Sequence, residues 1–194
     1  MPKTYSIFML HVELKGITPP IWRDLVVGGD ISLAKLHHYL QAAMGWTDSH
    51  LHAFYLNDKM YGDLKQDQDG ELEMLDERKI ILKRHLEQGG EFIYQYDFGD
   101  NWKHRIVVTN VIDDAAEPLG VACVENGQRA CPPEDVGGSG EYQRFVECIQ
   151  KDRNSEESKQ LLEWAGSDFH PELFDRHAAN AALLRMAWNR WGGR

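Results

Sequence analysis

The sequence predicts an α+β fold, in which an early helix packs against a mostly antiparallel sheet and the C-terminal part is helical. Two observations carry this prediction. The first 112 residues contain several short segments rich in β-formers, separated by turn residues. From Glu141 onward, the apolar residues follow a helical spacing instead. Strands followed by helices along the chain are typical of the α+β class.

The chain of 194 residues has the length of one domain of about 100–200 residues. We therefore expect a single domain over residues 1–194, with a sheet-rich part over 1–112 and a loop and helical part over 113–194. A core of ordinary size is expected, because 42% of the residues are hydrophobic.

The first strands and the early helix are bounded by clear signals. Strands are predicted over residues 4–14 and 21–27, with prolines between them. Ser32 has the position of an N-cap, and Gly45 that of a C-terminal stop. Between them, leucines and alanines recur at helical spacing, which predicts an amphipathic helix of about three turns.

The second half of the sheet is predicted from shorter segments. Residues 50–57 read as a short strand that "KMYG" continues as a hairpin arm, and residues 91–98 and 102–112 are the clearest strands. Residues 78–88 fit either a short helix or a strand.

The rest of the chain is predicted as loops and helices. Residues 63–77 form a polar, acidic surface loop, and the proline- and glycine-rich segment after residue 112 is also expected to be a loop. The predicted helices cover residues 141–151, 156–165 and 171–191. The third is expected to start at Pro171, since proline is favourable in the first turn.

The charge of the chain argues against a nucleic-acid partner. The formal net charge is −10, and residues 63–77 hold seven acids and one lysine. An acidic surface repels phosphates unless basic residues are segregated on one face. The C-terminal "RMAWNRWGGR" offers a small set of that kind, Arg185, Arg190 and Arg194.

A membrane partner is not expected either, because no run approaches the roughly 18 apolar residues of a membrane span. The N-terminal segment lacks the apolar core of a secretory signal. The three cysteines, Cys123, Cys131 and Cys148, are an odd and sparse set, which favours reduced thiols in a cytoplasm.

The stretch "YQYDFGDNWKHRIVV" concentrates candidate catalytic residues. If Asp100 and Asn101 are the central residues of a two-residue turn, Asp97 lies opposite His104 on the same face. Such a pair is an ion pair, or the base and its orienting group in a catalytic set. Alternatively, Asp97 and Asp100 bond turn amides and Trp102 covers the core.

Two histidines of "SHLHAF" are candidate metal ligands. His50 and His52 are two residues apart on the predicted strand and would point to one face, where both imidazoles can reach one divalent metal. A third ligand would come from Asp97, His104 or Glu134. Alternatively, His50 lies at the strand entry and His52 is a half-buried polar residue.

Further candidates are Glu134 and Asp135, which lie between a rigid Pro-Pro and a permissive Gly-Gly pair. They are interpreted as a fixed carboxylate pair beside a cleft, or as part of a loop that caps a helix starting near Ser139. Arg23 and Trp102 are candidates for a binding surface. Trp22, on the opposite side of its strand from Arg23, is expected in the core, and so is Trp46.

The acidic loop "DQDGELEMLD" compares poorly with a calcium-binding loop. With Gly70 at the sixth position, a lysine, Lys65, stands at the first position, where a carboxylate is required. A solvated acidic loop is therefore predicted. Motifs of nucleotide-binding loops, serine hydrolases and zinc proteases are not found in the sequence.

Five motifs in order resemble the plasmid pRiA4b ORF-3-like family: "PPIWRDLVV", "LHHYLQAAMGWTDSHLHAF", "YQYDFGDNWKH", "ACPPEDVGG" and "FHPELFD". They extend over about residues 5–185. Val136 departs from the pattern, because many members have a cysteine there. The resemblance implies an α+β fold and an association with plasmids and insertion elements, and it implies no activity.

Some members of that family carry a label taken from a transposon resolvase, as a TnpR-like passenger protein. A serine recombinase needs a nucleophilic serine among several arginines that hold the scissile phosphate. Between residues 1 and 77 this chain has only one arginine, Arg23. The residues do not support the label.

Three functions follow from these observations. The favoured hypothesis is a non-catalytic cytoplasmic module that binds a protein or a small molecule. The second is a metal-assisted or acid/base hydrolase with a site built from His50, His52, Asp97, Asp100, His104, Glu134 and Asp135. The third is a nucleic-acid accessory protein of a mobile element, which the charge argues against.

Overall fold

The computed structural model describes residues 4–65 and 73–189 and has the predicted α+β fold. One sheet of eight strands has the order β5-β4-β3-β6-β7-β1-β2-β8. All neighbours are antiparallel except β4 and β5. The strands are β1 (Tyr5–Leu14), β2 (Ile21–Gly28), β3 (His52–Leu56), β4 (Lys59–Gly62), β5 (Leu75–Asp76), β6 (Glu91–Tyr96), β7 (Trp102–Ala115) and β8 (Cys123–Gln128).

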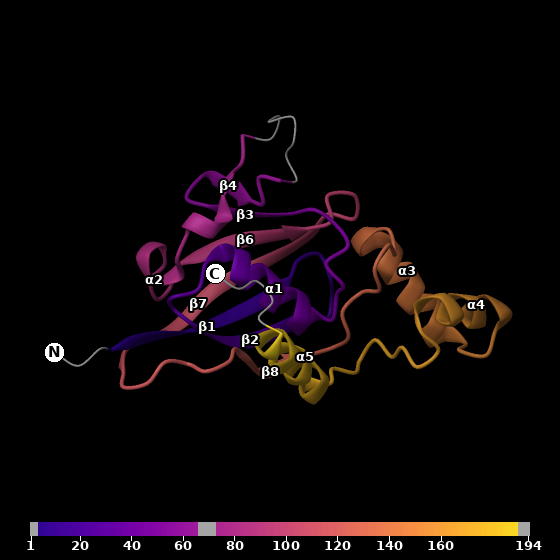
Figure 1. Ribbon diagram of the computed structural model, residues 1–194. Helices are drawn as coiled ribbons and strands as arrows, with labels where there is room; N and C mark the ends of the chain where they lie inside the picture. Colours follow the sequence, from indigo (N-terminus) through magenta and orange to yellow (C-terminus); the bar gives the residue numbers. More distant parts are fainter. Residues whose placement is uncertain (1–3, 66–72, 190–194) are drawn as a thin grey trace.

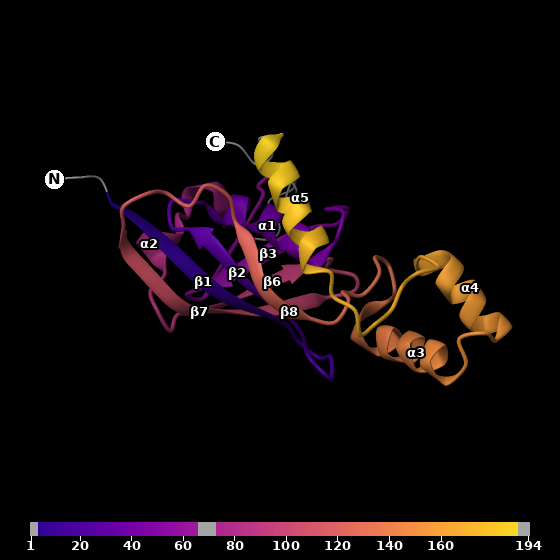
Figure 2. The same cartoon turned by 90° about the horizontal axis from the view of Figure 1, so that it is seen from below.

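The helices lie in two groups (Figures 1 and 2). Helices α1 (Leu33–Met44) and α5 (Arg176–Trp188) lie on the same face of the sheet and contact each other. Helices α3 (Gly138–Lys151) and α4 (Glu156–Ala165) pack together beyond one end of the sheet. Among the helices that the structure describes, none has the length and apolar character to cross a membrane.

The first helix forms as the sequence predicts. The Ser32 side chain accepts a hydrogen bond from the backbone N–H of Lys35, which satisfies one donor of the first turn. Gly45 ends the helix with φ of 92°, a left-handed conformation that glycine adopts without a steric penalty. Between these caps the helix buries Leu33, Leu36 and Leu40 against the sheet.

The prediction of a two-residue turn between β6 and β7 is wrong. Strand β6 ends at Tyr96 and β7 begins at Trp102, so five residues connect them. The pairing is Tyr94 with His104 and Tyr96 with Trp102. Asp97 lies in the loop with φ of 54°, and the predicted pairing of Asp97 with His104 is therefore absent.

The segment after residue 112 also differs from the prediction. Strand β7 continues to Ala115, and residues 123–128, expected as loop, form the edge strand β8. The polar sequence "CVENGQ" is tolerated there because an edge strand has one partner and one solvent-facing side. The amide side chain of Asn180 in α5 bonds both the N–H and the C=O of Val124, which ties this edge to the helix.

The last helix begins later than predicted. Pro171 lies in the preceding turn, where its carbonyl accepts a hydrogen bond from the N–H of Ala130. The helix starts at Arg176, after the N-cap Asp175, whose side chain accepts from the N–H of Ala178. The start of the helix is therefore set by the N-cap Asp175, whose side chain bonds a first-turn N–H, and not by the preference of proline for the first turn.

Three smaller predictions concern residues 78–88, the cysteines and the acidic loop. The ambiguous residues 78–88 contain the end of a 3-10 turn, η1 (Glu77–Lys79), and the four-residue helix α2 (Leu82–His85). The three cysteines are free thiols, as predicted. Most of the acidic "DQDGELEMLD" segment lies outside the described residues, and so do Arg190 and Arg194.

Candidate functional site

The loop between α1 and β3, residues 45–51, contributes side chains to two neighbouring polar clusters. We call the first the rim cluster, which consists of His50, Asp97, Glu134 and Asp135. We call the second the inner cluster, which consists of His37, Asp48 and His52. In each cluster, three residues offer metal-ligand atoms that lie within 4.8 Å of one another.

In the rim cluster the imidazole of His50 lies among three carboxylates. Its Nδ1 is 3.7 Å from Asp97 Oδ2. Its Nε2 is 3.2 Å from Asp135 Oδ1 and 3.8 Å from Glu134 Oε2. Asp97 comes from the β6–β7 loop, and the other two carboxylates come from the segment between β8 and α3. Three loops that are far apart in the sequence therefore meet at one imidazole.

The β6–β7 loop fixes the carboxylate of Asp97. Oδ1 accepts hydrogen bonds from the backbone N–H groups of Gly99, at 2.8 Å, and Asp100, at 3.2 Å. This geometry agrees with the interpretation that Asp97 bonds turn amides. The second oxygen, Oδ2, is the one nearest His50. One oxygen therefore holds the loop, while the other faces the cluster.

The two carboxylate oxygens of Glu134 also have different roles. Its Oε1 accepts hydrogen bonds from the N–H of Thr47 at 2.9 Å and the hydroxyl of Tyr96 at 3.1 Å. Burial raises the pKa of Tyr96 well above its ordinary value, so the phenol keeps the proton that it donates. The second oxygen, Oε2, is the one nearest His50.

Two buried atoms of the rim cluster have no hydrogen-bond partner among the described residues, His50 Nε2 and Glu134 Oε2. A buried polar atom without a partner costs about 1–3 kcal/mol. The two atoms are 3.8 Å apart, too far for a hydrogen bond between them. Both would be satisfied by one shared ligand between them.

The predicted grouping of His50 with His52 is wrong. Strand β3 begins at His52, so His50 lies in the loop before it and the two side chains do not share a strand face. His52 is buried, and its Nε2 is 2.9 Å from Glu77 Oε2 in a hydrogen bond. The two histidines therefore belong to different clusters, and His52 takes part in the inner cluster.

His104 joins neither cluster. It is fully buried, and its Nδ1 is 3.3 Å from the carbonyl oxygen of Tyr94, while its Nε2 has no partner among the described residues. Burial lowers the pKa of His104 to about 4, against the opposing effect of nearby backbone carbonyls. The side chain is a neutral core residue that packs edge-on against Trp46.

The other predicted site residues have structural positions. Asp100 Oδ2 accepts a hydrogen bond from the N–H of Gly137, the N-cap of α3. The loop that holds Glu134 and Asp135 leads into this N-cap, in agreement with the interpretation of a loop that ends at the helix start. Trp102 is 1% exposed and cannot offer a binding surface.

Arg23 is buried as well, although it was predicted as a surface residue. It is 1% exposed, and its guanidinium donates to the backbone carbonyls of Trp22, Ala43, Gln128 and Arg129. It also lies 3.7 Å from the centre of the Phe174 ring. The structure reverses the predicted orientation of these two side chains, since Arg23 is buried and Trp22 is part-exposed. Arg23 can be buried because the four carbonyls accept hydrogen bonds from its guanidinium.

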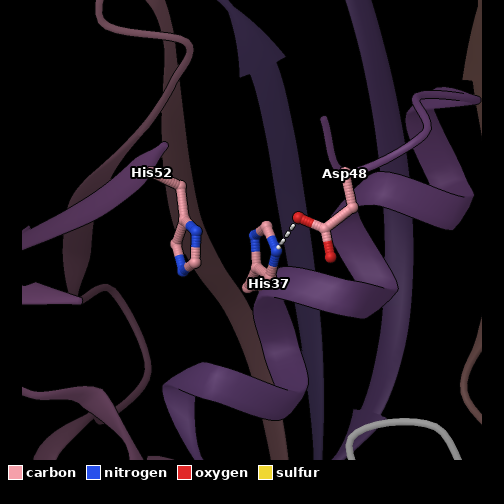
Figure 3. A group of neighbouring side chains, drawn as sticks. All are labelled: His37, Asp48 and His52. Carbon is pink, nitrogen blue, oxygen red and sulfur yellow. Dashed lines mark hydrogen bonds and ion pairs between the residues drawn. The ribbon is translucent and has the colours of Figure 1, made fainter. Parts of the chain in front are cut away.

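The inner cluster was missed by the sequence analysis (Figure 3). His37 Nε2 is 2.7 Å from Asp48 Oδ1, and His37 Nδ1 is 2.8 Å from the hydroxyl of Tyr94. Gln41 closes a ring, because its amide donates to the Tyr94 hydroxyl at 2.9 Å and its Oε1 accepts from the Asp48 N–H at 3.0 Å. We call these four residues the polar ring.

The polar ring fixes the tautomer of His37. Since the Tyr94 oxygen accepts from Gln41, its own proton goes to His37 Nδ1, and the proton of the imidazole lies on Nε2, which donates to Asp48. Burial lowers the pKa of His37 to about 4, so the neutral form persists at neutral pH. Every member of the ring is satisfied.

Asp48 is held as a carboxylate. Burial raises its pKa, but hydrogen bonds from His37 and His38 outweigh burial and bring the pKa below its ordinary value. The residue has φ of 59°, a left-handed conformation that persists only where the surroundings enforce it. The polar ring supplies that enforcement.

The inner cluster is a poor metal site in spite of its short distances. The ring centroids of His37 and His52 are 3.5 Å apart, and the rings are stacked with an interplanar angle of 5°. Figure 3 shows the two imidazoles next to each other. Nitrogen lone pairs lie in the plane of the ring, so two parallel stacked rings cannot direct them at one ion. His37 also uses both of its nitrogens in the polar ring.

One sequence signal could have revealed the inner cluster. His37 follows Leu33 by four residues and precedes Leu40 by three, so it lies within the apolar stripe of the predicted helix. A titratable residue on the buried face of a helix needs a buried partner. The partner Asp48 lies just past the helix stop at Gly45.

Comparisons with known proteins agree on one group. The family model described as plasmid pRiA4b ORF-3-like protein matches residues 6–178. The uncharacterized protein y4hQ of Sinorhizobium fredii is 37% identical over 184 residues, which covers 94% of this chain and 90% of that protein. The crystal structure of a protein of unknown function, MM3350 from Methanosarcina mazei Go1, matches with a TM-score of 0.79 and 31% identity, covering 92% of this chain and 98% of that one.

Proposed function

This chain belongs to the plasmid pRiA4b ORF-3-like family, and from that premise and the geometry of the rim cluster we propose that it is a binding protein whose rim cluster holds a divalent cation. The single observation that carries the proposal is the pair of buried atoms without partners, His50 Nε2 and Glu134 Oε2, on either side of a 3.8 Å gap.

The distances in the rim cluster support this proposal. Ligand bonds of about 2.0–2.2 Å place neighbouring ligand atoms about 3 Å apart around a metal ion. His50 Nε2 is 3.2 Å from Asp135 Oδ1 and 3.8 Å from Glu134 Oε2. His50 Nε2 is the common neighbour of both oxygens, and the carboxylates of Glu134 and Asp135 would have to converge on it for the three atoms to become ligands of one ion. Asp97 Oδ2 lies 3.7 Å from Nδ1, and a shift of this carboxylate to hydrogen-bond distance would orient the imidazole in the manner usual for metal-bound histidine.

The charge of the rim cluster points the same way. Three carboxylates gather around one imidazole, and two of them are largely buried, with 10% of the Asp97 side chain and 22% of the Glu134 side chain exposed. Like charges this close disfavour each other unless a cation lies between them. One imidazole with carboxylates is a ligand set that suits zinc or manganese.

The test is titration of metal-free protein with zinc and with manganese in a calorimeter. We expect about one ion per chain and a loss of affinity of more than tenfold in His50→Ala. His85→Ala is the matched control, because His85 is exposed and lies outside the cluster. It should bind the metal as the wild type does.

Elemental analysis of untagged protein gives an independent reading, with metal present in the wild type and in His85→Ala and absent from His50→Ala. The proposal fails if wild-type protein takes up no metal from excess zinc or manganese. It also fails if His50→Ala binds as tightly as the wild type, since the cluster would then not be the site.

A second candidate function, metal-assisted hydrolysis, is favoured by the position of Asp135. Its side chain is 71% exposed and lines a cavity of about 360 Å³ whose other walls include Arg144 and Trp164 of α3 and α4. A substrate in this cavity would reach the cation, which would act as a Lewis acid. Metal-loaded protein should then cleave a simple phosphoester or carboxylic ester, and His50→Ala should not. Absence of turnover on both classes would leave only the binding function.

A further inference from the structure

A second, separate cavity lies between α1, the loop after it and α5. It has a volume of about 610 Å³, within the range of about 300–1,000 Å³ that is usual for small-molecule sites. Ala42, Trp46 and Met186 contribute apolar surface, and His38, Asp48 and Arg185 contribute polar groups. The rim cluster lies outside this set of residues.

The carboxylate that lines this cavity is preorganised. The polar ring holds Asp48 Oδ1 through His37, and Oδ2 lies 3.3 Å from His38 Nδ1. In spite of these contacts, 38% of the Asp48 side chain remains exposed. A carboxylate accepts at about four lone-pair positions, so two contacts leave room for a further donor from the cavity. A group held this firmly loses little entropy when it binds a ligand.

A positive group also lines the cavity. Arg185 lies in the last turn of α5, and its guanidinium has no hydrogen bond or ion pair within residues 4–65 and 73–189. Its planar fork matches a carboxylate in a bidentate geometry. The cavity therefore carries a fixed anion from one element, a cation from another, and apolar walls from Trp46 and Met186.

We propose that this cavity binds a small zwitterion of the amino-acid type, with its ammonium group at Asp48, its carboxylate at Arg185 and an apolar side chain against Trp46 and Met186. Both charges of such a ligand meet an opposite charge, and its apolar part leaves water. A ligand with only one of the two charges would leave one protein group without a partner.

The first experiment measures thermal shift and then calorimetric binding with a panel of leucine, methionine, phenylalanine and tryptophan as free amino acids. Two analogues of each best binder, one lacking the carboxylate and one lacking the ammonium group, are measured in parallel. We expect one or more amino acids to bind and both analogues to bind at least about tenfold more weakly.

Charge-removing variants assign the two ends of the ligand. Arg185→Gln should weaken the amino acid about tenfold and leave the analogue that lacks a carboxylate unchanged. Asp48→Asn should do the same for the analogue that lacks an ammonium group. Arg144→Gln and Asp30→Asn are the matched controls, since both residues lie outside the cavity.

Ala182→Trp covers the case in which Asp48→Asn disturbs the fold. Ala182 lines the cavity from α5 and lies outside the polar ring, so a large side chain there should abolish binding while the wild-type melting temperature is kept. The proposal is overturned if no amino acid of the panel binds the wild type, if Ala182→Trp binds as the wild type does, or if the analogues bind as tightly as the amino acid.

Discussion

Acidification is expected to destabilise the protein through His104. This imidazole is fully buried, and burial lowers its pKa to about 4 from an ordinary value of 6.5. In the unfolded chain the imidazole takes up a proton as the pH falls through 6.5, whereas the folded protein resists protonation until about pH 4. The contribution of the neutral His104 to the free energy of unfolding is therefore complete above pH 6.5. It falls between pH 6.5 and pH 4 and is lost below pH 4.

The magnitude follows from the difference between the two pKa values. It amounts to about 2.5 units, and each unit corresponds to about 1.4 kcal/mol, so His104 alone should account for roughly 3 kcal/mol of lost stability. That is a large part of the roughly 5–15 kcal/mol by which a domain is stable. The surroundings compensate only in part for the burial of a charged imidazole, because Nε2 has no partner among the described residues and Nδ1 meets a carbonyl at 3.3 Å.

The assay is urea unfolding at about pH 7 and about pH 4.5, in wild type and in His104→Asn. Carboxylates also titrate in this interval, so the informative quantity is the difference between the two proteins. The variant should lose roughly 2–3 kcal/mol less than the wild type on acidification, whatever its stability at neutral pH. His85→Asn, which changes an exposed histidine, should keep the wild-type dependence. Equal losses in wild type and His104→Asn would refute the reasoning.

Other substitutions test the packing. Arg23→Met should lower the free energy of unfolding by about 3 kcal/mol, because buried carbonyls lose their donor; a loss below 1 kcal/mol in a urea titration would contradict this. Gly138→Ala should cost more than about 1 kcal/mol, since Gly138 has φ of 81° and a Cβ would lie 2.8 Å from a backbone oxygen. Gly140→Ala in the same helix, where a Cβ meets nothing within 4 Å, should leave the melting temperature unchanged or raise it. Tyr94→Phe should cost about 1–3 kcal/mol in thermal unfolding by leaving His37 without its donor, and an unchanged stability would show that the ring is not coupled.

Local signals in the sequence were sufficient for much of the fold. Ser32 and Gly45 bound the first helix because capping depends on neighbouring residues alone. The strand over residues 123–128 gives no such signal, since its polar sequence becomes a strand only by pairing with β2. The late start of α5 is a similar case, because Pro171 is held by a hydrogen bond from a distant segment.

The candidate site was predictable in composition and not in geometry. Asp97, Glu134 and Asp135 were recognised from turn and loop chemistry and His50 from its spacing to His52, and the structure places the three carboxylates around the imidazole of His50. The register of the hairpin decided the rest. Because a five-residue loop replaces the predicted two-residue turn, Asp97 lies in the loop and not on the strand. Its carboxylate therefore lies near His50 and not near His104.

The segment from Trp46 to His50, within the loop between α1 and β3, contributes to both the rim cluster and the cavity. Thr47 bonds Glu134, Asp48 lines the cavity, and His50 lies among the rim carboxylates. An ion at one end and an amino acid at the other would therefore act on the same short stretch of backbone. Thermodynamic linkage then requires reciprocity: if the metal changes the affinity for the amino acid by some factor, the amino acid changes the affinity for the metal by the same factor. A protein of this design would respond to two solutes through a single loop.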